Sequence, residues 1–148
     1  MKEERERETS GASPMPILIA LGVAAIVLIG FGISWLVRGD GLTEDNRVGR
    51  AAVGQNDALQ RENYPDFRKY TCAQQQGTEA EVIARQQQSK SAHGARFVDD
   101  VTAVKIEGER ATATVVYHFE RTPDKRLETP MTFVRESGEW KVCSPSPA

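Results

Sequence analysis

The chain falls into three stretches that differ in how their apolar residues are spaced. Residues 17–37 form an uncharged run of 21 residues. Residues 43–89 carry apolar positions at intervals of three and four, which is the spacing of amphipathic helices. From Phe97 onward apolar and polar residues alternate, as they do in strands that bury one face. The pattern predicts one long apolar helix, then shorter helices, then a series of strands.

The uncharged run, residues 17–37, is long enough to cross a membrane. As a helix it would span about 30 Å, the thickness of the hydrocarbon core of a bilayer. It is longer than the apolar region of a signal peptide, and no small-x-small cleavage site follows it. We therefore expect an uncleaved transmembrane helix that contacts the lipid bilayer, a disordered charged tail over 1–16 and a linker over 38–42. Within the run, Ala20 and Ala24 form a small-xxx-small pair that would suit a homodimer.

Three helices are predicted after the linker. Thr43 is a suitable N-cap for a helix over about 44–61. A short helix follows and ends near Cys72. The segment Thr78-x-x-Glu81 has the residues of a capping box for a third helix, which is expected to end near Ser89.

The alternating stretch predicts about four antiparallel strands. Gly108 and Glu109 suit a two-residue type II′ hairpin connection, because glycine stands first. Thr122–Lys125 has the composition of a second turn, with proline at its second position. Pro130 is expected to place the third strand at an edge or a bulge. Residues 43–145 are therefore predicted to form one α+β domain, with about three helices on one face of a curved antiparallel sheet.

Charge and motifs exclude several function classes. From Gly41 to the end, 15 Lys and Arg stand against 16 Asp and Glu. This near-neutral balance argues against nucleic-acid binding, which needs a basic face. The sequence contains no Gly-rich phosphate loop, no Gly-x-Ser-x-Gly and no His-Glu-x-x-His. With two cysteines far apart and two histidines, a zinc site is not expected, and no cofactor is predicted.

The two cysteines, Cys72 and Cys143, bear on the orientation of the chain in the membrane. Three Lys and Arg flank each end of the apolar run, so the positive-inside rule favours neither orientation. A cysteine pair in a small extracytoplasmic domain more often forms a disulfide, although two unrelated buried thiols are the alternative. A disulfide would place the domain on the oxidising side of a cell membrane and the N-terminus in the cytoplasm.

The order of elements resembles the nuclear-transport-factor-2-like superfamily of cone-shaped α+β domains. It is most similar to small actinobacterial single-pass membrane proteins that carry such a domain outside the membrane. The segments that carry the resemblance are DFRKYTC, over 66–72, and the run over 108–145, which ends in GEWKVCSP. The resemblance implies that Cys72 and Cys143 are paired.

The superfamily includes steroid isomerases and dehydratases, which place a carboxylate or a histidine, with tyrosines, inside the cone. His118 would be a candidate acid or base only if its face of the strand lines the cone. Asp99 and Asp100 are neighbours, and neighbours in a strand point to opposite faces, so they do not suit a catalytic dyad. Tyr117 could donate a hydrogen bond into a pocket or pack in the core. We do not expect an enzyme.

Three functions remain as hypotheses. The first is a non-enzymatic, membrane-anchored domain that binds or assists an envelope protein, a layout that is similar to mammalian-cell-entry-associated proteins. The second is a binder of a small apolar ligand within the cone, and the third is an isomerase-like or dehydratase-like enzyme. The residues that could line such a pocket, or else fill the core, are Tyr64, Phe67, Tyr117, His118, Phe119, Phe133 and Trp140.

Overall fold

A computed structural model describes residues 41–145 of the chain. The predicted transmembrane helix over 17–37, with its Ala20 and Ala24 pair, lies outside these residues, as do the tail over 1–16 and most of the linker. Within 41–145 no helix is both long enough and apolar enough to cross a membrane.

The first helix begins at the predicted N-cap, and the predicted short helix follows it. Helix α2 (Glu44–Gln60) is capped by Thr43, whose side chain accepts a hydrogen bond from the backbone N–H of Asn46. Helix α3 (Tyr64–Tyr70) is capped in the same way by Asn63. Its proline lies in the first turn, where a helix needs no N–H from that position. Both predicted helices are confirmed.

The third predicted helix is also confirmed, with a longer extent. A 3₁₀ turn, η1 (Ala73–Gln75), precedes α4 (Glu79–His93). The capping box of Thr78 and Glu81 is complete, because each side chain hydrogen-bonds the other residue's backbone N–H. The helix continues past Ser89 because the polar residues that follow are compatible with helix, and it ends at Gly94.

The strands form one antiparallel sheet in the order β1-β2-β3-β4. They are β1 (Arg96–Glu107), β2 (Arg110–Phe119), β3 (Thr122–Glu136) and β4 (Glu139–Val142). The two-residue hairpin connection is confirmed, and Gly108 has the positive φ of 61° that the first position of a type II′ turn requires. Beside Pro130, β3 pairs with β2 alone, because β4 pairs only with residues 133–136. The predicted edge position of this proline is therefore correct locally.

The turn predicted over Thr122–Lys125 is wrong. The chain reverses immediately before this segment, at Glu120 and Arg121, and Phe119 pairs directly with Thr122. The next register pair is Tyr117 with Leu127, so residues 123–126 form an irregularity within β3. Pro123 is tolerated there because a bulged position need not donate to the ladder. The turn-like composition thus marks a bulge next to the real turn.

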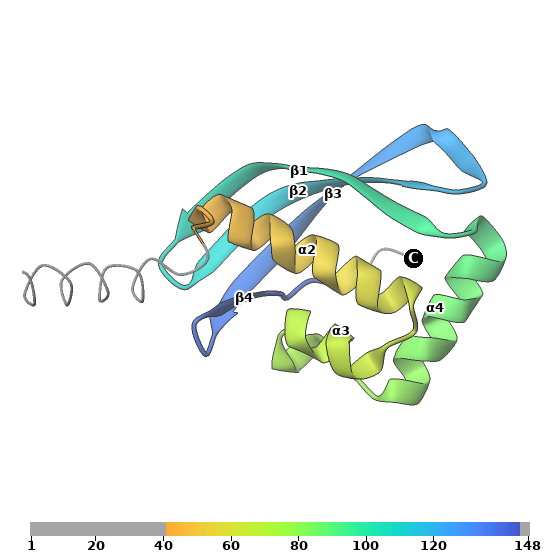
Figure 1. Cartoon of the computed structure of the whole chain (residues 1–148), viewed down its shortest axis with the longest axis horizontal. Coiled ribbons are helices and arrows are strands. Elements are labelled where there is room, and N and C mark those ends of the chain that lie inside the picture. Colours follow the sequence, from red (N-terminus) through yellow and green to blue (C-terminus); the bar gives the residue numbers. More distant parts are fainter. Residues whose placement is uncertain (1–40, 146–148) are drawn as a thin grey trace, which may run out of the picture. The chain divides into compact units, whose positions relative to one another are not determined.

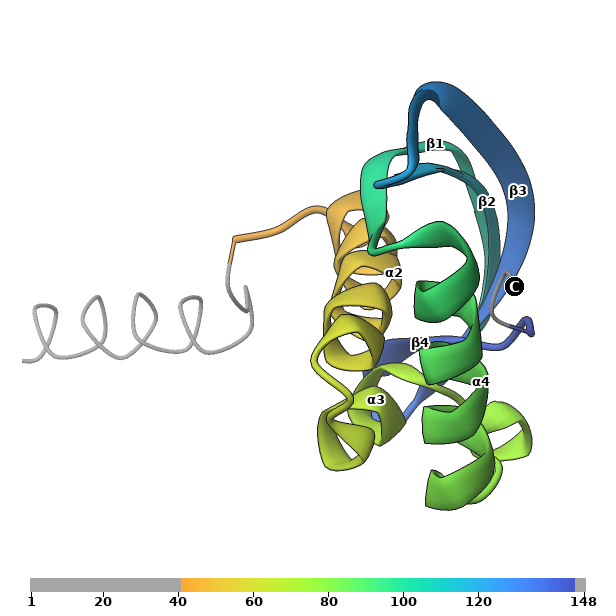
Figure 2. The ribbon, with the colours of Figure 1, turned by 90° about the vertical axis from the view of Figure 1, so that its right-hand side faces the viewer.

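The sheet is curved, and the helices lie against its inner face (Figure 1). Strand β1 has register shifts between Val98 and Asp100 and again between Thr102 and Lys105. Bulges of this kind bend a strand and increase its twist. Figure 2, seen from the side, shows the sheet bending around α2 and α4, with β3 on its far side. The predicted α+β architecture, three helices on a four-stranded antiparallel sheet, is confirmed.

Two hydrophobic clusters lie between these layers. The larger cluster joins α2 to the sheet and contains Val48, Ala51, Ala52, Ala111, Ala113, Val115, Met131, Phe133, Trp140 and Val142. Its alanines on α2 and β2 allow the helix to approach the sheet closely. The smaller cluster joins the three helices and contains Ala58, Leu59, Phe67 and Val82.

The Cys72–Cys143 disulfide is present, as the resemblance implied. It joins the segment after α3 to the end of β4, and the backbone N–H of Cys72 also donates to the carbonyl of Val142 at 2.9 Å. The disulfide therefore holds the helical layer to the last strand at a point where the backbone is already paired.

Candidate functional site

A cavity of about 350 Å³ lies beside the inner face of α4. Helix α4 packs chiefly against α2 and α3, whereas α2 is the helix that covers the sheet. The space left beside α4 is lined by residues from all three helices, from the start of β1 and from the segment after β4. Its volume is in the range of small-molecule pockets.

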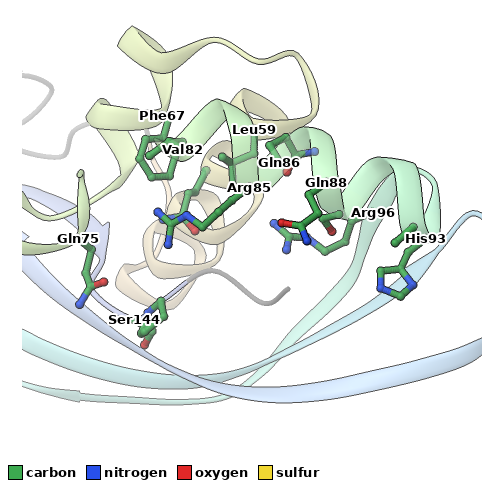
Figure 3. A pocket seen from close by; sticks show the side chains of 14 residues that line it. Leu59, Phe67, Gln75, Val82, Arg85, Gln86, Gln88, His93, Arg96 and Ser144 are labelled. Carbon is green, nitrogen blue, oxygen red and sulfur yellow. The ribbon is translucent and has the colours of Figure 1, made fainter. Parts of the chain in front are cut away.

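One part of the cavity is apolar. Leu59 of α2, Phe67 of α3 and Val82 of α4 line it, and all three belong to the smaller hydrophobic cluster. In Figure 3 these three side chains lie together, with His93 at the opposite end of the cavity. A ligand would therefore find a hydrocarbon surface on one side only.

Arg96, the first residue of β1, brings a buried positive charge to the cavity lining. The residue is 6% exposed. Its Nε–H donates to Oδ1 of Asn56 at 2.8 Å, and its guanidinium lies 5.9 Å from the ring centre of Tyr117. Burial lowers the pKa of Arg96, because desolvation disfavours the charged form, although an arginine remains protonated at neutral pH.

Gln86 is a second buried polar residue of the lining. It is 6% exposed and stands on the inner face of α4, one turn after Val82. Within residues 41–145 its side-chain amide makes no hydrogen bond, and its polar atoms are reached from the cavity rather than sealed in the core. Gln55, by contrast, donates from Nε2 to Oγ1 of Thr71 at 2.9 Å. A buried amide that faces a cavity finds its partner in whatever occupies that cavity.

Charged and hydroxyl-bearing side chains also line the cavity. Arg85 and Arg96 are cationic, and none of the described residues that line the cavity is Asp or Glu. The hydroxyls of Ser89 and Ser144 are present, but no hydrogen bond in the described structure joins either to His93. Among the described lining residues, neither serine hydroxyl is therefore paired with this imidazole. Nor does the described part of the chain hold a cluster of His, Cys, Asp or Glu suited to a metal ion.

Of the seven residues predicted to line a pocket, Phe67 lines this cavity. Phe133 and Trp140 belong to the core between α2 and the sheet. Tyr64 stacks on Phe67, with ring centres 6.1 Å apart, and its hydroxyl donates to the carbonyl of Gly77. Packing and an internal hydrogen bond use these three side chains, and none of them lines this cavity.

Tyr117 and Phe119 lie on the inner face of β2 and are buried. Their rings pack edge to face, with centres 5.7 Å apart. Tyr117 borders a separate hollow of about 20 Å³, which is too small for an organic ligand. Neither residue lines the larger cavity, and both fill the core, which is the alternative stated for them.

His118 lies on the opposite face of the sheet from the helices and does not line this cavity. Its Nδ1 lies 2.9 Å from both carboxylate oxygens of Asp99, and its ring stacks on Phe97. Arg126 pairs with the same carboxylate at 3.1 Å. Asp100 instead accepts a hydrogen bond from the backbone N–H of Val101. The two neighbouring aspartates therefore have separate partners and form no dyad.

The polar cavity residues were not identified from the sequence. A usable signal exists in α4, where Val82, Gln86, Ser89 and His93 recur at helical spacing and line the cavity. A helix face that is apolar at its start and polar toward its end indicates a lining that is not pure core. Arg96 offers no such signal, because only the tertiary fold shows that the first residue of the sheet is buried.

Comparisons with known proteins give similarity of structure at low sequence identity. No protein-family model matches the chain, and no curated protein matches it. A provisionally named NTF2-like transpeptidase from Campylobacter jejuni is similar, with TM-score 0.45 and 14% identity over 63% of this chain and 94% of that chain. A provisionally named dehydratase of the NTF2-like family from Streptomyces avermitilis has TM-score 0.46 and 16% identity, over 71% and 97% of the two chains.

A provisionally named polyketide cyclase from Xanthomonas campestris is also similar, with TM-score 0.44 and 16% identity over 71% of this chain and 93% of that chain. Two of these three names contain the words NTF2-like. The similarity lies in the arrangement of helices and strands, and the activities in these names are those of the other proteins.

Proposed function

We propose that residues 43–145 form a non-enzymatic binding domain that holds a small, partly apolar ligand in the cavity beside α4. We further propose that residues 17–37 anchor this domain to a cell membrane, on the extracytoplasmic side. The cavity of about 350 Å³ carries the first proposal. Its volume, its apolar end and its buried polar groups are the features of small-molecule sites.

Two features of the chain support the location. The uncharged run of 21 residues has the length of a membrane span. The Cys72–Cys143 disulfide suits an oxidising compartment. Fractionation of the full chain tests the anchor: the protein should remain in the membrane pellet after a carbonate wash. In cells that have been stripped of their outer layers but keep an unbroken cell membrane, added protease should degrade the domain. A domain protected from that protease would contradict the orientation.

Blocking the cavity tests the binding role. Ser89 lines the cavity from α4, so Ser89→Trp should fill it, while Ser91→Trp on the exposed face of the same helix serves as the matched control. The full chain, reconstituted in lipid nanodiscs, is titrated with hexanoate, 1-hexanol and hexylammonium by calorimetry. At least one probe should bind saturably to the wild type and to Ser91→Trp, but not to Ser89→Trp. Equal binding by all three proteins, or no binding by any, would refute the role.

An accessory role beside an envelope protein is a second candidate, favoured by the outer face of the sheet. Phe97 is 48% exposed there and stacks on His118, so an aromatic patch faces away from the helices. A photo-crosslinker at position 97, used in native membranes, should give one discrete adduct. The same group at exposed position 79 should give none. A smear from both positions, or no adduct from position 97, would contradict this role.

A further inference from the structure

We propose that the ligand of this cavity is a small, uncharged molecule that carries a carboxamide group, paired with the side-chain amide of Gln86. Its hydrocarbon part would lie against Leu59, Phe67 and Val82. This inference rests on the proposed binding role and names the chemical class of the ligand. An anion and an apolar molecule without an amide are the alternatives that the experiment below tests.

The buried amide of Gln86 carries the inference. The residue is 6% exposed and lines the cavity from α4. Its amide makes no hydrogen bond to residues 41–145, and its polar atoms are reached from the cavity. Buried polar groups of proteins are nearly always hydrogen-bonded. Since a side-chain amide has both N–H donors and a carbonyl acceptor, its full partner must offer an acceptor and a donor together.

A carboxamide offers these two groups in the matching arrangement. Its N–H and its carbonyl oxygen lie side by side, as they do in Gln86, so the two amides can pair through two N–H···O hydrogen bonds. A carboxylate or a ketone has acceptors alone and would leave Oε1 of Gln86 without a donor. An ammonium group has donors alone and would leave the N–H groups of Gln86 without an acceptor.

The charged residues of the lining do not call for a charged ligand. The Nε–H of Arg96 donates to Asn56, and its guanidinium lies 5.9 Å from the ring centre of Tyr117, so protein groups already contact this charge. Arg85 is exposed and is therefore solvated by water. An ionised ligand would lose its own hydration on entering a cavity with an apolar end, and that loss is larger for a charge than for a neutral amide.

The position of the apolar residues supports a short hydrocarbon part. Figure 3 shows Leu59, Phe67 and Val82 at one end of the cavity, with Gln86 between them and His93. The carboxamide and the hydrocarbon part of one ligand would thus lie side by side in the same space. A cavity of about 350 Å³ accommodates a compact ligand of this kind.

Three probes that differ only in the group on one carbonyl carbon separate the alternatives: hexanamide, 2-heptanone and hexanoate. They are titrated by calorimetry into the full chain in zwitterionic lipid nanodiscs, with empty nanodiscs as the blank. Hexanamide should bind about threefold tighter than 2-heptanone, or more, because it makes one additional hydrogen bond. A merely apolar pocket would give the reverse order, since the methyl ketone has more apolar surface. Hexanoate should bind more weakly than hexanamide.

The order of affinities decides the outcome. If 2-heptanone or hexanoate binds as tightly as hexanamide, or more tightly, the inference is overturned, while saturable binding of any probe leaves the proposed binding role intact. An absence of binding by all three probes would overturn the inference and count against the binding role as well.

Gln86→Leu should remove the preference for hexanamide over 2-heptanone. This substitution keeps the approximate volume of the side chain and removes its amide. Hexanamide should then bind about three- to tenfold more weakly, because its hydrogen bonds to Gln86 are lost, while 2-heptanone should bind as well as before or better. Gln87→Leu makes the same change at the neighbouring exposed position, outside the cavity lining, and should leave the preference unchanged. An unchanged preference in Gln86→Leu would overturn the inference.

The wild type supplies a test that needs no substitution and so covers the case in which Gln86→Leu does not fold. The side-chain ¹⁵NH₂ signals of Gln86 should shift as hexanamide is added, because its N–H groups gain an acceptor. Those of Gln87, whose Nε2 donates to Glu62 at 2.9 Å outside the cavity, should not shift. Shifts at neither glutamine, or equal shifts at both, would overturn the inference.

Discussion

Gln86 and Arg96 are both buried polar residues, but their side chains differ in the hydrogen bonds that they make to the surrounding protein. The Nε–H of Arg96 donates to Asn56, whose own side-chain amide donates back to the carbonyl of Arg96 at 3.1 Å. This reciprocal pair fixes the start of β1 against α2. Gln86 lacks such a partner within the described residues, although it is equally buried. An amide that faces a cavity and makes no hydrogen bond to the protein is more typical of a binding site than of a close-packed hydrophobic core.

Gln86→Leu should therefore stabilise the protein in the absence of ligand. The amide of Gln86 makes no hydrogen bond to the described residues, and leucine of similar volume would add apolar contact beside Leu59 and Val82. We expect the free energy of unfolding to rise by about 1 kcal/mol, measured by urea denaturation. Lys90→Leu, at an exposed position of the same helix outside the cavity lining, should change it by less than about 0.5 kcal/mol. A loss of stability in Gln86→Leu would mean that the amide has a structural partner.

Helix α2 contains two glycines whose surroundings differ. A Cβ on Gly49 would lie 3.8 Å from Cβ of Val101, which is an ordinary contact. A Cβ on Gly54 would lie 2.6 Å from the ring of Tyr70. The second glycine therefore allows α3 to approach α2, whereas the first has no such role.

Gly49→Ala and Gly54→Ala should accordingly have opposite effects. Alanine is a better helix former than glycine by about 1 kcal/mol, so Gly49→Ala should raise the free energy of unfolding by up to that amount. In Gly54→Ala the overlap with Tyr70 should outweigh this gain, because overpacking costs about 1–3 kcal/mol. Urea denaturation of both variants measures the two signs. A stabilised Gly54→Ala would show that the tyrosine ring moves aside freely.

The N-terminus of α4 should give the domain an acid-sensitive contribution. Hydrogen bonds from the hydroxyl and then the backbone N–H of Thr78 hold the pKa of Glu81 below its usual value of 4.5. A carboxyl whose pKa is lowered by folding stabilises the fold above its unfolded pKa and loses that contribution as the pH falls through the folded value. The stability difference between wild type and Glu81→Ala should thus be constant near pH 7 and shrink below about pH 4.5.

Glu79→Ala provides the control for this experiment. Glu79 is in the first turn of the same helix and interacts with its dipole, but it makes no capping hydrogen bond in the described structure. Its substitution should have a smaller effect near pH 7. A difference between wild type and Glu81→Ala that grows on acidification would contradict the assigned role of the capping box.

The disulfide acts on the entire domain, because it closes a loop that contains most of it. Cys72 and Cys143 are 71 positions apart. Constraining an unfolded chain over such a loop contributes about 4 kcal/mol in the loop-entropy description. Replacing both cysteines with alanine should lower the free energy of unfolding by about this amount, measured by urea denaturation and circular dichroism. Reductant should destabilise the wild type to a similar extent and leave the double variant unchanged. A wild type indifferent to reductant would contradict the bridge.

Local signals account for most of the architecture. The caps at Thr43 and Thr78, the glycine of the first hairpin and the alternation along β2 act over a few residues, so the sequence shows them directly. The same locality explains the wrong turn at Thr122–Lys125. Turn residues also suit a bulge, and only the pairing of Phe119 with Thr122 distinguishes the two.

The cavity depends on contacts between segments far apart in the chain. The packing of α4 against α2 and α3 decides which aromatic residues fill the core and which line the cavity. Phe67 and Phe133 are both buried in apolar clusters, yet only the assembled helices leave an opening beside the first. The sequence by itself therefore determined the helices and strands, because caps, turns and hydrophobic spacing act between residues close in the chain. Only the tertiary structure decided that Arg96 and Gln86 lie beside the same cavity, because the burial of a side chain depends on all the segments that pack around it.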